Sequence, residues 1–438
     1  MANDKDFLLK NAVEVGGPTK VTLGTVTSNN IDLATGNYFA DTPSGTSTYT
    51  ISNAGDVQSF QLEVTGGTAE VLSNFSTTLY TGNATARTIT NGIDLANDGG
   101  LVWVKSRSTR NHILSDTERG TGKVLFSNLD IAEDADATTI TSYNSDGFTM
   151  DSSAFKMNTN GEDFVSWTFK KEPSFFDVVT YTGTGTDASH FQDISHNLGV
   201  VPGVVMIKRL NSAENWAVWH RSIPSDMLQL NVTDSSGSAG GRFTSSGVAN
   251  MTSTTFRVYG DNQTGTSGGT YVAYLFAHDD AADGLIQCGS YTGTGSSQSI
   301  NLGWEPQWLL IKSTGAADWY ILDTQRGWTS VSLTNKMLNP NNSTAESTVG
   351  NVVYDIALSS IGFDLASTAS QFNAGGQDYI YIAIRAASDP DITWPSSIEW
   401  AGGIAPSAPA VGETDVFTLS TDDGGTSYVG VKTADNLS

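Results

Sequence analysis

One unit of about 100 residues occurs three times in this chain, and a period of that size is the length of one domain. Each copy contains Tyr-Thr-Gly, with the tyrosine at Tyr80, Tyr181 and Tyr291. An apolar run follows in every copy and ends in a lysine, at Lys105, Lys208 and Lys312. The repeat favours a tandem array of one module over a single large domain.

The residue pattern inside the unit predicts strands. Each copy closes with an aromatic-rich run, at Phe164–Phe169, Tyr271–Phe276 and Tyr379–Ile384. Apolar and polar residues alternate elsewhere, as in Phe60–Val64, and clusters of Gly, Asn and Asp separate these runs. We therefore expect an all-β, multidomain chain of β-sandwich or jelly-roll-like modules, with short helices only at residues 131–137 and 343–347.

Composition limits the partners of the chain. Its 438 residues carry a formal net charge of -24, which argues against non-specific nucleic-acid binding and against adhesion to anionic membranes.

The single Cys288 excludes an intramolecular disulfide framework and a cysteine-based zinc site. The polar start, Met1–Asp6, predicts no signal peptide, and no apolar run is long enough to insert in a membrane. We expect synthesis in a cytoplasm.

The two ends of the chain differ from the repeats. Residues 1–72 and 389–438 are polar and β-rich, and neither part has enough apolar residues for a core of its own. We expect them to form one split base domain, for attachment or oligomerisation, because exposed loop tips tolerate inserted domains. The inserted modules are then repeat 1 (73–172), repeat 2 (173–282) and repeat 3 (283–388).

These end segments carry a family resemblance. The strand Phe60–Gly67, the segment Trp394–Gly403 and the hairpin 415–430 resemble a small β-domain of tailed-bacteriophage fibre and virion structural proteins. Ser420 and Tyr428 depart from that pattern without threatening the fold. The repeats resemble a module of marine phage structural proteins, and repeat 2 has diverged from it at Trp219 and His220. The resemblance implies a virion protein with a split domain around the triple repeat, located in the virion.

Charged residues recur at the same places of the three copies. The recurring arginines are Arg119, Arg221 and Arg326. They suit either an anion or sugar-acid site or, as we favour, a structural ion pair with a neighbour such as Asp116 or Asp323. The recurring lysines are interpreted as the points where an apolar strand emerges from the core into water. All six are expected to serve the scaffold.

Aromatic side chains are the candidates for contact with a glycan or receptor, because aromatic faces stack on sugar rings. The candidates are Trp216, Trp219, His220, Trp319, Tyr320 and Trp328. The competing interpretation is that aromatic residues with a period of two form the core. Loops that differ between the copies are the better candidates, at residues 127–144, 224–250 and 329–351.

The sequence predicts no catalytic residues and no cofactor. Acidic runs at Asp130–Asp136 and Asp279–Asp283 leave Ca²⁺ open, although solvated loops are the favoured interpretation. No nucleophile, base and acid stand in a credible order.

We therefore expect a non-enzymatic tail fibre or tail-associated protein that contacts the host surface. Its expected partners are other virion proteins, copies of itself in a trimer, and a glycan or protein of the host. The alternatives are a head decoration or head fibre protein bound to the capsid shell, and a polysaccharide-degrading tailspike.

Overall fold

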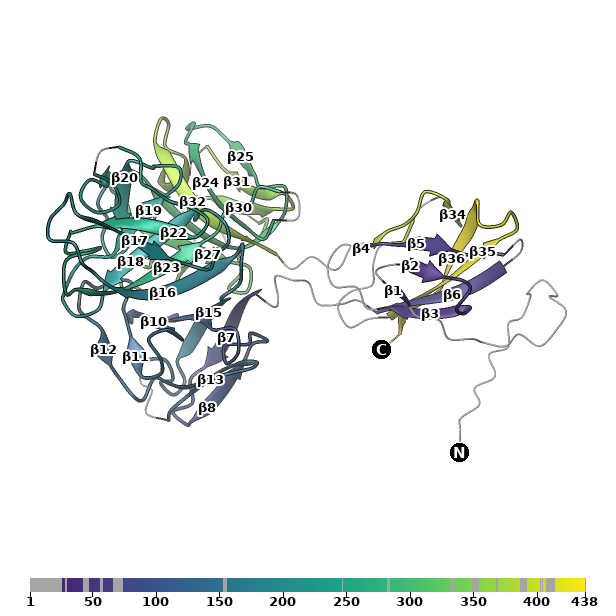
Figure 1. Ribbon diagram of the computed structural model, residues 1–438, viewed down its shortest axis with the longest axis horizontal. Helices are drawn as coiled ribbons and strands as arrows, with labels where there is room; N and C mark the ends of the chain where they lie inside the picture. The colour runs from purple at the N-terminus through teal and green to yellow at the C-terminus, as the bar shows by residue number, and fades with distance from the viewer. Residues whose placement is uncertain are drawn as a thin grey trace. The chain divides into compact units, whose positions relative to one another are not determined.

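The structure is a computed structural model, and strands dominate it (Figure 1). It describes residues 26–437 except 28–29, 42–46, 56–57, 66–73, 153–155, 246, 282–283, 332–334, 349–353, 368, 387–391, 402, 404 and 407–413. Among these residues the one helix is α2 (Ser370–Asn373). The prediction of an all-β chain built from β-sandwich modules is confirmed. The short helices expected at 131–137 and 343–347 are wrong, because these segments lie in extended chain that includes β12 (Asp134–Ala135) and the start of β29 (Ser347–Thr348).

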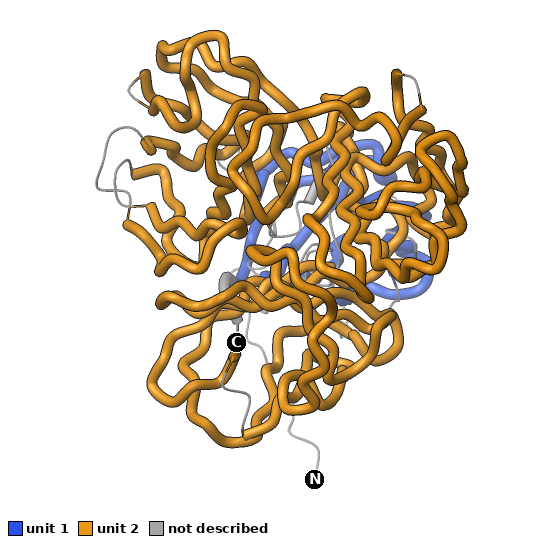
Figure 2. The backbone as a smooth tube through the Cα atoms, turned by 90° about the vertical axis from the view of Figure 1, so that its left-hand side faces the viewer, with its two compact units in different colours: residues 1–69, 388–438 blue, residues 70–387 orange. Residues whose placement is uncertain are grey.

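The chain divides into two compact units, coloured separately in Figure 2. Unit 1 contains residues 1–69 and 388–438, and unit 2 contains residues 70–387. Unit 1 is thus built from both ends of the chain, and unit 2 contains the three repeats.

Unit 1 is centred on a five-stranded sheet with the order β3-β6-β35-β36-β34. These strands are β3 (Tyr38–Asp41), β6 (Gln58–Thr65), β34 (Ile398–Trp400), β35 (Thr414–Thr421) and β36 (Tyr428–Leu437). The smaller strands are β1 (Val26–Thr27), β2 (Asn30–Asp32), β4 (Ser47–Thr48), β5 (Thr50–Ser52) and β33 (Ile392–Thr393). Antiparallel pairing of β6 with β35 joins the first and last parts of the chain.

Alternation along β6 and β35 makes one face of that sheet apolar. Phe60, Leu62 and Val64 of β6 are buried, as are Phe417 and Leu419 of β35. Because side chains alternate across a strand, the residues between them lie on the opposite face. The core of unit 1 therefore combines residues more than 300 positions apart.

Each repeat of unit 2 contains one large and one small sheet. In repeat 1 the large sheet has the order β10-β9-β15-β7 and the small one β13-β14-β8. The strands are β7 (Phe75–Thr81), β8 (Arg87–Thr90), β9 (Gly100–Ser106), β10 (His112–Asp116), β11 (Lys123–Val124), β13 (Ile140–Asn144), β14 (Gly147–Met150) and β15 (Asp163–Lys170). A core that includes Val102, Ile113 and Phe148 lies between the two sheets.

Repeats 2 and 3 have corresponding sheets of different size. In repeat 2 the large sheet has the order β16-β23-β18-β19-β20-β21 and the small one β17-β22, and in repeat 3 they have the orders β24-β32-β26-β27 and β25-β31-β30. The strands of repeat 2 are β16 (Phe176–Thr182), β17 (Phe191–Ser195), β18 (Val204–Arg209), β19 (Ala217–His220), β20 (Asp226–Gln229), β21 (Gly237–Ser238), β22 (Thr255–Tyr259) and β23 (Thr270–Phe276). Those of repeat 3 are β24 (Ile286–Thr292), β25 (Gln298–Asn301), β26 (Pro306–Ser313), β27 (Trp319–Asp323), β28 (Lys336–Met337), β30 (Ile356–Ser359), β31 (Gly362–Leu365) and β32 (Asp378–Arg385).

The three large sheets share one core. In each of them the closing strand lies between the first strand and the lysine-bearing strand, as β15 does between β7 and β9. Corresponding residues of these sheets are buried in a single cluster, such as Phe169 of repeat 1, Phe276 of repeat 2 and Ile384 of repeat 3. The repeats are therefore not independent domains connected by linkers, because the inner faces of their large sheets bury one another.

Both connections from unit 2 to unit 1 leave this shared core at the same place. Phe75 opens β7, and its ring centroid is 6.0 Å from that of Trp308. Ile384, near the end of β32, pairs in register with the same Trp308. Unit 2 is therefore an insertion whose entry and exit lie side by side.

Candidate functional site

The lysine that ends each apolar strand is buried, and its ammonium group organises the loop that follows. Lys105 Nζ donates hydrogen bonds to the carbonyls of Ser106 and Ser108, the latter at 2.7 Å. Lys312 Nζ donates to the carbonyls of Ser313 and Gly315, and Lys208 Nζ to that of Arg209. The expectation that these strands emerge into water at the lysine is therefore wrong.

Burial changes the protonation of these lysines. The desolvation of the ammonium group lowers the pKa of Lys105, Lys208 and Lys312 to about 8. The backbone carbonyls replace the lost water, so each lysine acts as an internal cap for its loop.

Two of the recurring arginines form the structural ion pair that the sequence favours. Arg119 Nε lies 2.6 Å from Asp116 Oδ2, and Arg326 Nε lies 2.6 Å from Asp323 Oδ2, with all four side chains buried. Arg221 does not correspond to them, because it directly follows His220 and donates to His278 Nε2 at 2.9 Å. His220, which pairs with Val204, occupies the register position of Asp116, which pairs with Leu101.

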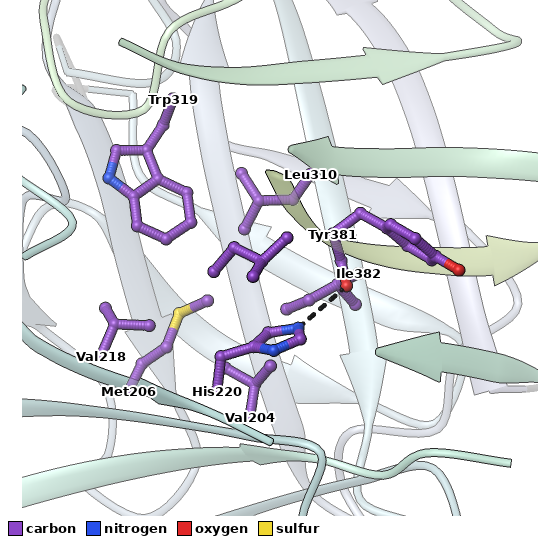
Figure 3. Close-up of a pocket in the computed structure, with 9 residues that line it drawn as sticks. Val204, Met206, Val218, His220, Leu310, Trp319, Tyr381 and Ile382 are labelled. Atoms are coloured by element: carbon purple, nitrogen blue, oxygen red, sulfur yellow. Dashed lines mark hydrogen bonds between the residues drawn. The ribbon is translucent and has the colours of Figure 1, made fainter. Parts of the chain in front are cut away.

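The residues at these positions form hydrogen bonds between the repeats, from each repeat to the next and from the third to the first. Asp116 of repeat 1 accepts a hydrogen bond from Tyr274 of repeat 2 at 2.8 Å. His220 of repeat 2 lies 3.2 Å from the Tyr381 carbonyl of repeat 3, beside a cavity of about 10 Å³ (Figure 3). Asp323 of repeat 3 accepts from Trp167 Nε1 of repeat 1 at 2.9 Å. Each repeat thus contacts the next, and the third contacts the first.

A second set of contacts connects each repeat to the one before it. In each repeat the contact starts from the residue at, or just before, the beginning of the strand that follows the lysine loop. Trp216 Nε1 of repeat 2 donates to the Phe126 carbonyl of repeat 1 at 2.9 Å. Trp319 Nε1 of repeat 3 donates to the Gln229 carbonyl of repeat 2 at 3.0 Å. His112, at the same position of repeat 1, faces the Asn339 backbone of repeat 3. The three repeats therefore form a closed ring with pseudo-threefold symmetry.

Backbone hydrogen bonds close the seams of the ring, where a seam is the contact between neighbouring repeats. The 1–2 seam has Glu133 N–H to Leu210 O at 2.8 Å and Glu214 N–H to Asp130 O at 2.7 Å. The 2–3 seam has the equivalent pair, Ser236 N–H to Thr314 O at 2.7 Å and Ala317 N–H to Thr233 O at 2.8 Å.

The 3–1 seam is different. It keeps the first bond, from Glu346 N–H to Arg107 O at 2.9 Å, and adds an ion pair between the two side chains at 2.7 Å. At the position of the second bond the structure has a cleft of about 360 Å³. The cleft is lined by Thr109, Arg110, Asn111, Ile113, Phe126, Lys156 and Ser343.

Charges in this cleft are balanced locally. Arg110 Nε lies 2.6 Å from Glu162 Oε2, and Lys156 Nζ lies 2.6 Å from Asp134 Oδ2 and 2.8 Å from Asp136 Oδ2. These carboxylates raise the pKa of Lys156 against the opposing effect of burial. Lys156 Nζ also lies 5.5 Å from the centroid of the Phe126 ring. The cleft combines polar groups with the apolar side chains of Ile113 and Phe126, without a net excess of positive charge.

The aromatic candidates for glycan contact lie in the core. At most 5% of each residue is exposed for Trp216, Trp219, His220, Trp319, Tyr320 and Trp328. A buried ring cannot stack on a ligand that arrives from solvent, so the structure corrects the interpretation of these residues as a contact surface. Five of them form hydrogen bonds to backbone carbonyls, as Trp219 Nε1 does to that of Pro224.

The acidic runs show no metal site among the described residues. Nowhere in that part of the chain do three or more His, Cys, Asp or Glu side chains gather to hold a metal ion. In the first run, Asp134 and Asp136 pair with Lys156. The second run includes residues 282–283, which lie outside the described residues.

Sequence reasoning missed the cleft. It indicated residues 127–144 and 329–351 as variable loops, and Ser343 lies in the second of them, but Arg110 and Lys156 attracted no attention. The available signal was His112, where the other two copies have tryptophan. That difference marks the seam at which the symmetry is broken.

The fold and these contacts define an all-β protein with three β-sandwich repeats joined in a ring. The model of a protein family described as a domain of unknown function, DUF7483, matches residues 72–388, and the chain therefore belongs to this family. No curated protein matches the chain.

The solved structures add little. The crystal structure of the STIV MCP aligns with 9% sequence identity over 73% of this chain and 98% of that chain. Its TM-score of 0.14 carries no argument about fold or function. Within the described residues no helix is long and apolar enough to cross a membrane.

Proposed function

We propose that the chain is a non-enzymatic structural protein of a tailed-phage virion, and that it works as a tail fibre or tail-associated protein in contact with the host surface. The observation that supports this proposal most directly is the pairing of β6 with β35. These strands contain the segments that resemble the phage fibre domain, and they pair from Thr65 with Thr414 to Gln58 with Thr421. The residues of the first pair are 349 positions apart, so unit 1 forms from both ends of the chain, which supports the proposal of a small domain split by an insertion.

Unit 2 suits the display of loops. Its ring closes within one chain, around a core that includes the Phe169, Phe276 and Trp308 side chains. Its entry and exit lie beside Trp308, whereas the lysine loops lie at the other end of the strands. A strand of seven residues such as β7 is about 20 Å long, so the loops stand well away from the connections. Binding residues often lie on loops that a rigid scaffold holds in place.

The proposal assigns assembly to unit 1 and host contact to unit 2. The ring of unit 2 needs no second chain to complete its core, so a homotrimer would form through unit 1, which would also bind other virion proteins. Val429 and Val431 on β36 are 54% and 42% exposed, an apolar pair on one face of the sheet that suits such a contact.

Labelling of intact virions tests this function. An antibody raised against the full chain should bind to the tail in the electron microscope, and the purified chain should adsorb to host cells and block infection. Label on the capsid without adsorption to any susceptible host would overturn the proposal in favour of head decoration. Release of reducing sugar from host polysaccharide would overturn the non-enzymatic assignment.

A further inference from the structure

The 3–1 seam has room for a ligand where the other seams have a backbone hydrogen bond. Arg110 stands two residues before His112, as Glu214 stands before Trp216 and Ala317 before Trp319. Ser343 stands four residues after Asn339, as Asp130 stands after Phe126 and Thr233 after Gln229. Symmetry therefore assigns the missing bond to the Arg110 N–H and the Ser343 carbonyl.

These two groups are not joined in the described structure, and both residues line the cleft. Both residues are only partly buried, and a cleft that opens in place of such a bond offers one donor and one acceptor to whatever enters it. The side chains of Thr109, Asn111 and Ser343 add hydroxyl and amide groups around the same space.

The size and chemistry of the cleft restrict the ligand. Its volume of about 360 Å³ is at the lower end of the range of small-molecule pockets. Arg110 and Lys156 are each held by carboxylates, so an anion would compete with Glu162, Asp134 and Asp136. A ligand with several hydroxyl groups can both donate to the Ser343 carbonyl and accept from the Arg110 N–H.

We propose that the cleft between repeats 1 and 3 binds a neutral sugar residue of a glycan. This inference rests on the proposed function, because it names the class of host molecule that unit 2 would contact. Hydroxyl, amide and backbone groups fix the orientation of the sugar. The Phe126 ring contributes an apolar edge rather than a free stacking face, because Lys156 lies over it.

The test uses the full chain on an array of neutral and acidic glycans, and titration of a bound glycan by saturation-transfer-difference NMR. The blocking variant is Thr109→Trp, since Thr109 is an exposed residue of the cleft wall and the larger side chain fills the space. The matched control is Ala316→Trp, which adds the same ring at the equivalent exposed position beside the closed 2–3 seam.

We expect the chain to bind neutral glycans, at millimolar dissociation constants for a single sugar, with at least a tenfold loss in Thr109→Trp and no change in Ala316→Trp. Thermal unfolding of both variants should match that of the parent chain. If Thr109→Trp unfolds early, Ser343→Gln replaces it, because its longer side chain enters the cleft from repeat 3.

Three outcomes would overturn the inference: no glycan bound, only acidic glycans or extended peptides bound, or binding that survives the blocking variant. They are distinguishable from failure of the proposed function. Tail labelling and host adsorption that persist in Thr109→Trp would leave the function standing without this site. Glycan binding by a chain that labels only capsids would leave the site standing without the function.

Discussion

The buried lysines make stability depend on pH in a direction opposite to that of a paired surface lysine. Below pH 8, Lys105, Lys208 and Lys312 are protonated both in the folded chain, where their pKa is about 8, and in the unfolded chain, where it is near 10.5. Between these values the folded state has released protons that the unfolded state still binds. The free energy of unfolding therefore rises with pH over this window.

We predict that unit 2 is more resistant to urea at pH 9.5 than at pH 7.5. Lys312→Met should reduce the slope of this dependence, because one of the three titrating groups is removed. Above about pH 10 the gain should reverse, since burial also raises the pKa of tyrosines such as Tyr320. Urea unfolding curves followed by tryptophan fluorescence at four pH values measure the effect, and a flat profile from pH 7.5 to 9.5 would contradict it.

Asp323 is a buried acidic residue that holds two buried partners. It accepts from Arg326 at 2.6 Å and from Trp167 Nε1 of another repeat at 2.9 Å. Asp323→Ala leaves the buried guanidinium with only the 3.4 Å contact to Glu346 and the Ile321 carbonyl, and loss of the closest carboxylate of a buried ion pair costs about 3–5 kcal/mol of unfolding free energy. Chemical denaturation measures the loss, and the exposed Asp280→Ala serves as the control. A loss below 1 kcal/mol in Asp323→Ala would show that water reaches Arg326.

Single residues were predictable from sequence where the environment is local. The pairing of Arg119 with Asp116 and of Arg326 with Asp323 follows from a spacing of three residues. The burial of Lys105 does not, because the carbonyls that receive its ammonium group come from a loop conformation that composition does not specify. The aromatic candidates failed for a related reason: only the neighbouring repeat covers them.

At the scale of elements, the Tyr-Thr-Gly signature marks the end of the first strand of each repeat. Gly82, Gly183 and Gly293 each donate a backbone hydrogen bond to the loop before the closing strand, at 2.8, 2.8 and 2.7 Å. A Cβ atom at Gly183 would lie 2.3 Å from the Thr266 carbonyl oxygen. Glycine recurs here because two backbones approach too closely for any side chain.

We predict that Gly183→Ala destabilises unit 2 by about 1–3 kcal/mol, the usual cost of forced overpacking. The clash is with backbone, which cannot rotate away as a side chain can. Gly237→Ala is the control, since nothing lies within 4 Å of its Cβ position. Thermal melting of the two variants compares them, and equal midpoints would mean that the loop moves aside at no cost.

Strands and the split between the chain ends were predictable because both leave marks in composition and periodicity. The ring was not. Its seams are made by backbone groups, such as the carbonyls of Leu210, Thr314 and Arg107, whose side chains share no type. Comparison of the three copies finds what repeats in side chains, and a contact made by main-chain atoms leaves no such trace.

At the scale of the whole molecule, the two units have cores with no residue in common. We therefore predict two calorimetric transitions for the full chain. Leu62→Ala, in the core of unit 1, should lower the midpoint of only one transition and reduce the free energy of unfolding of that unit by about 2–5 kcal/mol. Leu310→Ala, in the shared core of unit 2, should do the same to the other transition only. A single transition that both variants shift together would show that the units unfold as one.

The broken symmetry of the ring predicts where unit 2 opens first. The 1–2 and 2–3 seams each have the two equivalent backbone hydrogen bonds, whereas the 3–1 seam has one of them beside the cleft, together with the ion pair of Arg107 with Glu346 and side-chain bonds such as that from Ser127 Oγ to the Pro340 carbonyl at 2.6 Å. Local opening is easiest where few buried contacts hold the backbone. The amide hydrogen of Glu346 should therefore exchange faster than those of Glu133 and Ser236, after correction for intrinsic rates.

Arg107→Ala should accelerate exchange at Glu346 further, because it removes the ion pair beside the Glu346 backbone bond and leaves the Glu346 carboxylate with the longer contacts to Arg326 at 3.4 Å and Lys336 at 3.8 Å. Arg209→Ala is the matched control, since Arg209 bonds only to Asn211 and Asn262 within its own repeat among the described contacts. Mass spectrometry of peptides that span the three seams reads out all the rates in one experiment. Equal protection of the three amides in the parent chain would mean that the cleft does not weaken the ring, and that its walls are held by the shared core alone.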